Sequence, residues 1–113
     1  MKAILLAVLA LFVLPIAHAQ EFPVKPVRLV VPFPPGGPLD IAGRLIGQQL
    51  SEIWKQPVIV ENRPSANGVI AAQFVAKSAP DGYTLFITSN TTHSANPSLM
   101  KALPYDPIKD FAP

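Results

Sequence analysis

The sequence predicts an α/β fold built on an open, mostly parallel sheet. Three segments are rich in β-branched and apolar residues, as strands buried on both faces are. A helical pattern of apolar residues follows each of them, which gives the order β-α-β-α-β-α. Proline, glycine and asparagine stand at the boundaries between these elements, where turns are expected.

The first strand and helix are expected on either side of a Pro- and Gly-rich turn. Residues 27–31, Val-Arg-Leu-Val-Val, are the expected strand. The helix is expected to begin at Asp40, whose carboxylate suits an N-cap. Its apolar residues fall on one stripe, the pattern of a helix packed on a core. They are Ile41, Leu45, Ile46, Leu50, Ile53 and Trp54.

Four further elements complete the expected order. Residues 58–61 form the second strand and residues 69–77 a shorter helix, with Ile70, Phe74 and Val75 inward. Residues 80–82, Pro-Asp-Gly, form a turn before the third strand at residues 83–88. Asn96 and Pro97 then open a short helix, with asparagine as its cap and proline at its first position.

The first twenty residues have the features of a secretory signal peptide. A basic start at Lys2 precedes an apolar run, and Ala17-His18-Ala19 forms a cleavage site, so residues 1–19 are expected to be removed after Ala19. The run is too short for a membrane span, and the chain has no cysteine to carry a lipid; a retained membrane anchor is the alternative. We expect export to the periplasm, with no membrane insertion after removal of the signal.

Composition excludes several classes of protein. Nine Lys and Arg face seven Asp and Glu without any basic run, so the pI near 9.2 indicates no nucleic-acid partner. The absence of cysteine means that an exported chain must be held by its core alone, as in a bacterial periplasmic protein. One histidine past the signal and no cysteine make no metal-ligand set, and we expect no cofactor.

Ligands of open α/β sheets bind beyond the carboxyl ends of the strands. Three loops are expected there: the first loop (residues 32–39), the second loop (residues 62–67) and the third loop (residues 89–95). In the second loop, Arg63 could bind a carboxylate, pair with Glu61 or pack beneath Pro64.

Two glycines stand in the first loop just before the helix. Gly36 and Gly37 let backbone N–H groups approach a ligand, and a helix N-terminus favours an anion. No Walker A or G-x-G-x-x-G motif is present, so a rigid connector is an equal interpretation. Asp40 would repel an anion, and we expect it to cap the helix or to meet an amino group of a ligand.

Hydroxyl and amide side chains dominate the sequence from Thr88 to Ser94. Such short polar groups suit hydrogen bonding to a small polar ligand; the alternative is a Ser/Thr-rich surface loop. His93 has no G-x-S-x-G motif and no nearby acid in the sequence, so we predict no catalytic residue.

Four stretches in this order carry a resemblance to a known family: KPVRLVVPFPPGGPLDIAGRL, QPVIVENRPSANG, AKSAPDGYTLFITSNTTHSANPSL and LPYDPIKDFAP. The chain resembles the periplasmic solute-binding receptors of tripartite tricarboxylate transporters, the Bug family. The resemblance implies a two-lobed type II periplasmic-binding fold, of which residues 20–113 would form part of the first lobe. Leu39 stands where the family often has threonine, and Ser65 and Asn67 replace two frequent glycines.

The resemblance also implies a function. Receptors of this family bind small carboxylates, such as di- or tricarboxylates or acidic amino acids, between their lobes, and deliver them to the membrane components of the transporter. One carboxylate is held between the first and third strand loops. Carried over by position, the ligand-binding residues would be Phe33, Gly36, Gly37, Thr88, Ser89, Asn90 and Thr91, to which the residues themselves add Asp40.

Other classes of protein remain possible from the residues alone. A secreted α/β hydrolase or transferase could use the first loop as an anion hole, although no nucleophile–base pair is visible. A truncated product that does not fold is a third hypothesis. We expect a non-catalytic receptor.

Overall fold

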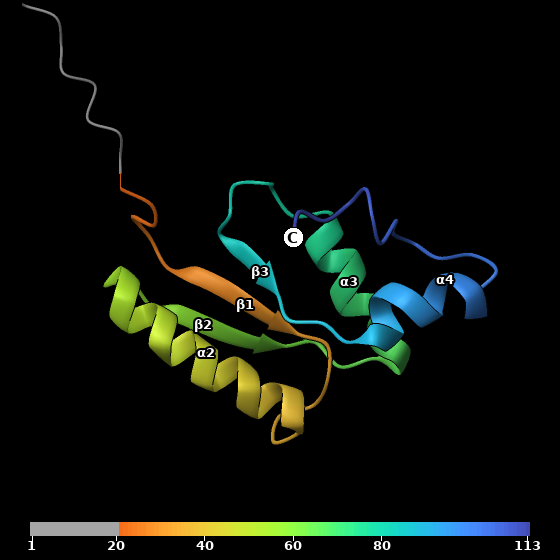
Figure 1. Cartoon of the computed structure of the whole chain (residues 1–113), viewed down its shortest axis with the longest axis horizontal. Helices are drawn as coiled ribbons and strands as arrows, with labels where there is room; N and C mark the ends of the chain where they lie inside the picture. Colours follow the sequence, from red (N-terminus) through yellow and green to blue (C-terminus); the bar gives the residue numbers. More distant parts are fainter. Residues whose placement is uncertain (1–20) are drawn as a thin grey trace, which may run out of the picture.

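The structure is a computed structural model that describes residues 21–113, and the expected signal peptide and its cleavage site lie outside the described residues. A small sheet forms its centre, with helices around it (Figure 1). The element order is β-α-β-α-β-α with two short helical turns added, which confirms the predicted α/β class.

The sheet has three parallel strands in the order β2-β1-β3. They are β1 (Val27–Val31), β2 (Val58–Asn62) and β3 (Thr84–Phe86). The central strand β1 is the most buried, because it is covered by neighbours on both edges and by helices on both faces; Val27, Val30 and Val31 have no exposed surface. The third strand is shorter than the expected residues 83–88.

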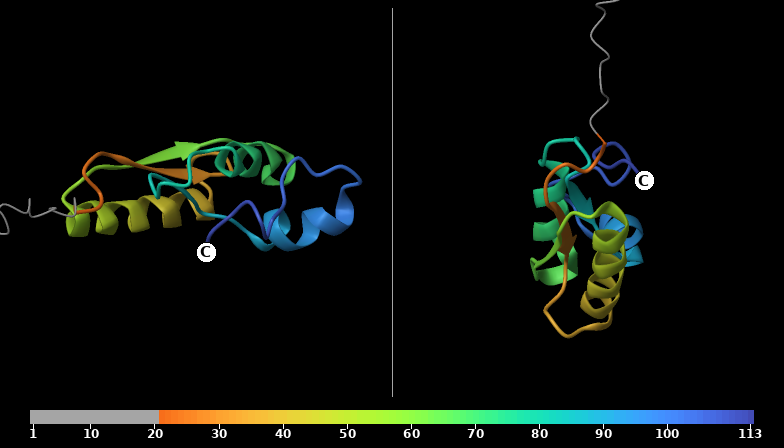
Figure 2. Two further views of the ribbon diagram at one scale, coloured as in Figure 1. Left: turned by 90° about the horizontal axis from the view of Figure 1, so that it is seen from above. Right: turned by 90° about the vertical axis from the view of Figure 1, so that its left-hand side faces the viewer.

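Helix α2 (Pro38–Trp54) and helix α3 (Val69–Ala76) cover opposite faces of the sheet (Figure 2). Side chains of a strand alternate between faces. Gly43 of α2 lies against Leu29 and Val31 of β1, whereas Arg28, between them, lies over the ring of Phe74 from α3. The carboxyl ends of the strands therefore open between two helical layers.

Helix α2 differs from the prediction in its start. It begins at Pro38 with Gly37 as its N-cap, so the expected N-cap at Asp40 is wrong. Proline suits the first helical position because its φ is preset and its missing N–H would have no partner there. Asp40 is therefore the third residue of the helix.

The expected inward stripe of α2 is also largely wrong. Ile41, Leu45, Ile46 and Ile53 are between 47% and 71% exposed, while Leu50 and Trp54 are half-buried. The face against the sheet carries small residues instead: Gly43 lies against Val31, and Gly47 lies against Val58 and Val60. Two glycines four residues apart let the helix approach the strands so closely that its larger apolar residues point away.

The remaining helical turns are arranged differently from the prediction as well. In α3, Ala71 and Ala72 are buried, whereas Ile70, expected inward, is 56% exposed. A turn η1 (Ala66–Gly68) precedes α3, and η2 (Thr91–Ala95) leads directly into α4 (Asn96–Leu99). Most of the third loop is therefore helical. Asn96 makes no cap, because its side chain is buried in other contacts.

Candidate functional site

Three connections meet at the carboxyl edge of the sheet. Because the strands are parallel, the first, second and third loops all leave from this edge (Figure 1). Gly68 marks the point where they touch. A methyl group built on it would lie 2.9 Å from Thr92 Oγ1 and 3.0 Å from Pro32 Cβ. The expected position of the three loops is therefore confirmed.

The first loop presents the start of α2 to this edge. Gly36 is exposed with φ +85°, a conformation that favours glycine, and Gly37 accepts the first helical hydrogen bond from Ile41 N at 3.0 Å. The N–H groups of Leu39 and Asp40 precede the first intrahelical bond and have no backbone acceptor among residues 21–113. These two backbone donors lie at the positive end of a 17-residue helix.

The carboxylate of Asp40 connects the first and second loops. It is 3% exposed. Its Oδ2 accepts hydrogen bonds from Gly36 N at 2.8 Å and Arg44 Nε at 3.0 Å, and its Oδ1 accepts one from Asn62 Nδ2 at 2.9 Å. These donors, Arg44 first, lower the pKa of Asp40 from 3.8 to about 2, against the opposing effect of burial. The carboxyl group of Asp40 is ionised, and both of its oxygens accept hydrogen bonds.

The carboxylate of Asp40 therefore holds the backbone of the first loop in place, and we do not propose this side chain as a ligand contact. The N–H of Gly36 is occupied as well, because it donates to Asp40 Oδ2. Asn62 extends the link, since its Nδ2 also donates to the carbonyl of Phe33 at 3.0 Å. Sequence reasoning missed Asn62, although its position directly after the second strand was a signal.

The third loop is less complete in its hydrogen bonding. Thr88 Oγ1 lies 3.1 Å from His93 Nδ1 and 3.4 Å from the carbonyl of Ser89. The hydroxyl of Ser89 is buried and has no hydrogen-bond partner among the described residues. Asn90 is exposed and Thr91 half-buried. A buried hydroxyl without a partner is costly, so a group that completes it would be stabilised there.

A buried polar network fixes the third loop to the second. Asn96 Nδ2 donates to the carbonyl of Asn67 at 2.9 Å and lies 3.0 Å from Tyr105 Oη, which donates to the carbonyl of Thr92 at 2.6 Å. Asn67 has φ +55°, a left-handed conformation that asparagine adopts more readily than most other residues. The predictions from sequence did not include Tyr105 or Thr92, whose residue types gave no positional signal.

Arg63 does not face the carboxyl edge as a free cation. Its guanidinium lies 2.6 Å from Glu61 and 3.7 Å above the ring of Phe74. This confirms the alternative in which Arg63 pairs with Glu61. A second contact, Arg28 Nε at 3.1 Å, completes the pairing of Glu61 on the α3 face of the sheet.

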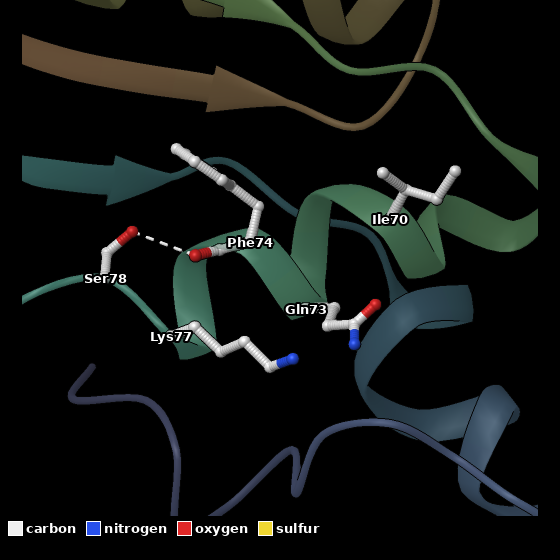
Figure 3. A pocket seen from close by; sticks show the side chains of 5 residues that line it. All are labelled: Ile70, Gln73, Phe74, Lys77 and Ser78. Carbon is white, nitrogen blue, oxygen red and sulfur yellow. Dashed lines mark hydrogen bonds between the residues drawn. The ribbon is translucent and has the colours of Figure 1, made fainter.

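Two cavities lie beside these elements. One, of about 480 Å³, is lined by Thr88, His93 and apolar residues of β3 and of the chain beyond residue 106. The other, of about 500 Å³, is an open hollow along α3, lined by Ile70, Gln73, Phe74, Lys77 and Ser78 (Figure 3). Only the first adjoins the third loop.

Residues 21–113 contain no group of three or more His, Cys, Asp or Glu placed to hold a metal ion. No helix in that part of the chain has the length and apolar character to cross a membrane.

Comparison with known proteins places the fold and the loops in a family. Residues 42–113 match the family described as the tripartite tricarboxylate transporter family receptor, TctC. A UPF0065 protein of Bordetella pertussis is 46% identical over 99 residues, which cover 86% of this chain and 31% of that protein. The chain therefore spans about a third of the length of the curated relatives it matches.

Solved structures agree with this assignment. MatC from Rhodopseudomonas palustris with bound malate has a TM-score of 0.77 and 46% identity, over 81% of this chain and 31% of that chain. R. palustris Rpa4515 with adipate has a TM-score of 0.74 and 41% identity, over 77% and 29%. The periplasmic binding protein BugD has a TM-score of 0.77 and 37% identity, over 81% and 30%. The match to the family model covers more than half of the chain, and these structures share its fold, so the chain, with its parallel sheet and convergent loops, belongs to the TctC family of tripartite tricarboxylate transporter receptors.

Proposed function

We propose that the full-length protein carrying this chain is a periplasmic receptor that captures a small carboxylate and delivers it to the membrane components of a tripartite tricarboxylate transporter. Residues 20–113 contribute part of the first lobe. The ligand lies at the carboxyl edge of the sheet and is enclosed when a second lobe closes over it. Malate and adipate, bound in two of the similar structures, are the first ligands to test.

The observation that supports this function is a set of hydrogen-bond donors at the carboxyl edge of the sheet that lack partners among the described residues. The N–H groups of Leu39 and Asp40 lack backbone acceptors, and Ser89 Oγ is buried without a partner. A carboxylate is acceptor-only when ionised, so it matches N–H and O–H donors at the positive end of a helix. The rigid prolines of the first loop keep these donors in position before binding, which limits the entropy lost with the ligand.

Several residues of the two loops then contact the ligand. Phe33 and Gly37 present backbone on one side, and Thr88, Ser89, Asn90 and Thr91 present hydroxyl and amide groups on the other. Gly36 acts through the shape of its backbone, because its N–H is bonded to Asp40.

The proposed receptor is not an enzyme. Within the described residues, His93 has Thr88 as its hydrogen-bond partner and no carboxylate beside its ring to orient it as a base. This arrangement lacks the third member of a nucleophile–base–acid set. A hydrolase that uses the first loop as an anion hole is therefore the weaker alternative.

Binding of carboxylates to the full-length protein tests the proposal. Thermal shift and isothermal titration calorimetry would use malate, adipate and citrate, with the corresponding amides as neutral controls. We expect at least one carboxylate to raise the Tm and to bind without being consumed, while its amide does neither. Binding of no carboxylate, or turnover of carboxylic esters that is lost on replacement of Ser89 and His93 by alanine, would contradict it.

A further inference from the structure

Thr88 and His93 form a polar pair whose hydrogen-bond direction is decided by one proton. The hydroxyl of Thr88 has one proton, and the two acceptors near it are His93 Nδ1 at 3.1 Å and the carbonyl of Ser89 at 3.4 Å. An imidazole nitrogen either donates or accepts, depending on the tautomer and the charge. The pair therefore has two states that differ in what Thr88 offers to a ligand.

In the first state, Nδ1 of His93 is unprotonated and accepts the hydroxyl proton of Thr88. The oxygen of Thr88 then turns only lone pairs outward, and these repel a carboxylate. In the second state, Nδ1 carries a proton and donates it to Thr88 Oγ1. The hydroxyl proton is then left with the carbonyl of Ser89, a contact of 3.4 Å that is long for an O–H donor and easily exchanged.

We propose that His93 is a positioning residue for the carboxylate ligand: it donates from Nδ1 to Thr88 and so turns the hydroxyl of Thr88 into a donor toward the ligand. This inference rests on the proposed function. It assigns a role to the one histidine of the described residues, which the site as carried over from the family did not include. Both side chains line the cavity of about 480 Å³, so a small molecule can reach the pair.

Packing holds the His93 ring in the orientation that this role requires. The ring of Phe111 meets it edge-on with the centroids 4.8 Å apart, and Phe86 of β3 lies at 6.1 Å. Tyr105 contacts Phe111 at 6.0 Å and is itself fixed by its bond to the carbonyl of Thr92. The ring has few other orientations available, which leaves its protonation as the variable.

Charged groups near His93 are occupied elsewhere. The segment that packs on its ring carries Asp106, Lys109 and Asp110. The carboxylate of Asp106 accepts the backbone N–H groups of Ile108 and Lys109, and that of Asp110 accepts the N–H of Asp106. The Nζ of Lys109 lies 3.9 Å from Asp106. Phe86, at the end of β3, and Thr88, two residues beyond it, also contact the ring, and neither is charged.

The role predicts a pH dependence of ligand affinity. A fall in pH, from about 8 to about 5.5 in the assay, favours a proton on both ring nitrogens of a histidine. Protonated His93 must donate from Nδ1, and Thr88 Oγ1 is the group that accepts this bond. Affinity of the wild-type protein for malate or adipate should therefore rise by about 10-fold over this range, since a charge-assisted bond replaces a repulsive contact.

Two variants separate this role from packing. His93→Asn places an amide N–H₂ near the position of Nδ1, so it should retain affinity within about 3-fold at pH 7 and lose the pH dependence. His93→Phe preserves the ring and its aromatic contacts without a donor, and should bind about 10-fold more weakly than wild type at low pH. Circular dichroism and Tm of both variants check that each is folded.

A double-mutant cycle with Thr88→Val completes the test, measured by calorimetry on the full-length protein with malate and adipate. If His93 acts through Thr88, His93→Phe should change affinity by less than about 2-fold in the Thr88→Val background. An equal loss in both backgrounds, or the same pH dependence in His93→Asn as in wild type, overturns the inference. Nitrogen NMR of the wild-type complex gives a check that needs no variant: Nδ1 of His93 found unprotonated in the complex also overturns the inference.

The two proposals fail in different ways. Failure of every carboxylate to bind wild-type protein would remove the proposed function and this inference together. Binding that is unaffected by pH and by both His93 variants would leave the receptor function intact and remove only the role of His93.

Discussion

Asp40 and Ser89 lie at the same edge of the sheet but differ in how far their hydrogen-bonding capacity is used. The carboxylate of Asp40 is surrounded by three donors from the first loop, from its own helix and from β2. The hydroxyl of Ser89, also buried, has no partner among the described residues. All hydrogen bonds of the Asp40 carboxylate are therefore made within the folded chain, whereas the Ser89 hydroxyl has an unused hydrogen-bonding capacity.

This difference reverses a common assumption about charged residues in a binding site. A buried charge next to a glycine-rich loop is easily taken for a ligand-binding group. A buried charge is stable, however, only when hydrogen-bond or ion-pair partners within its own protein compensate for the lost water. The carboxylate of Asp40 meets that condition, so we assign this side chain to the scaffold and not to ligand contact. The neutral hydroxyl of Ser89 costs much less to leave unpaired, so a site can hold it ready for a ligand.

The largest effect is expected where the two regions are joined, at Gly68. Gly68→Ala puts a methyl group 2.9 Å from Thr92 Oγ1 and 3.0 Å from Pro32, at φ +71°. Left-handed strain adds to the clash, and we expect the free energy of unfolding to fall by about 3 kcal/mol. Urea denaturation of the full-length protein measures it.

Gly36→Ala is the matched control for this change. Gly36 also has positive φ, at +85°, but nothing lies within 4 Å of the position of the added methyl group. Only the conformational strain remains, so the loss should be about 1 kcal/mol. Equal losses for the two variants would mean that the contact of the three loops at Gly68 adds nothing to stability.

A smaller effect is expected from Asp40→Asn. The amide keeps the shape but turns an N–H₂ group toward one of the three donors, and it removes the charge that Arg44 pairs with. The fall in stability at pH 7 should lie between those of Gly68→Ala and Gly36→Ala. Glu52→Gln, on the exposed side of α2, is the control and should change little.

The pH dependence of stability isolates the carboxylate of Asp40. Its pKa is lowered from 3.8 to about 2 in the folded chain, so the unfolded chain binds the proton more readily. The stability that Asp40 contributes is therefore complete above about pH 4 and is lost as pH falls toward about 2. Urea denaturation at several pH values measures this. As pH falls below about 4, the free energy of unfolding should fall less steeply for Asp40→Asn than for wild type; equally steep falls would contradict the assignment.

How far the sequence predicts this fold can be judged from its strands and helices. The central strand was predictable, because residues 27–31 are apolar at every position except Arg28, as a strand in the middle of a parallel sheet is expected to be. The face that α2 buries against the sheet was not predictable. Periodicity assigns large apolar residues to the core, and it gives no weight to Gly43 and Gly47, whose lack of a side chain decides how closely the helix packs.

The candidate site was predictable to the level of loops but not of bonds. Turn residues and strand ends locate the first and third loops. The partners of Asp40 and Thr88 come from elsewhere: Asn62 lies 22 residues from Asp40, and His93 is turned toward Thr88 by a helical turn that a run of Ser, Thr and Asn does not indicate. Such contacts depend on tertiary packing, which local sequence does not encode.

The smallest effect, and the most direct test of the comparison, is expected from Ser89→Ala. Removing a buried hydroxyl that has no partner should leave the free energy of unfolding unchanged or raise it by less than about 1 kcal/mol. Affinity for malate or adipate should nevertheless fall by about 5-fold, because the ligand loses a donor that nothing else in the site replaces. Ser94→Ala, on the exposed surface of η2, is the control and should change neither quantity. Calorimetry and urea denaturation on the same preparations provide both numbers. If Ser89→Ala stabilises the protein and leaves affinity unchanged, the free hydroxyl is only a packing defect, and Ser89 would join Asp40 as a residue of the scaffold.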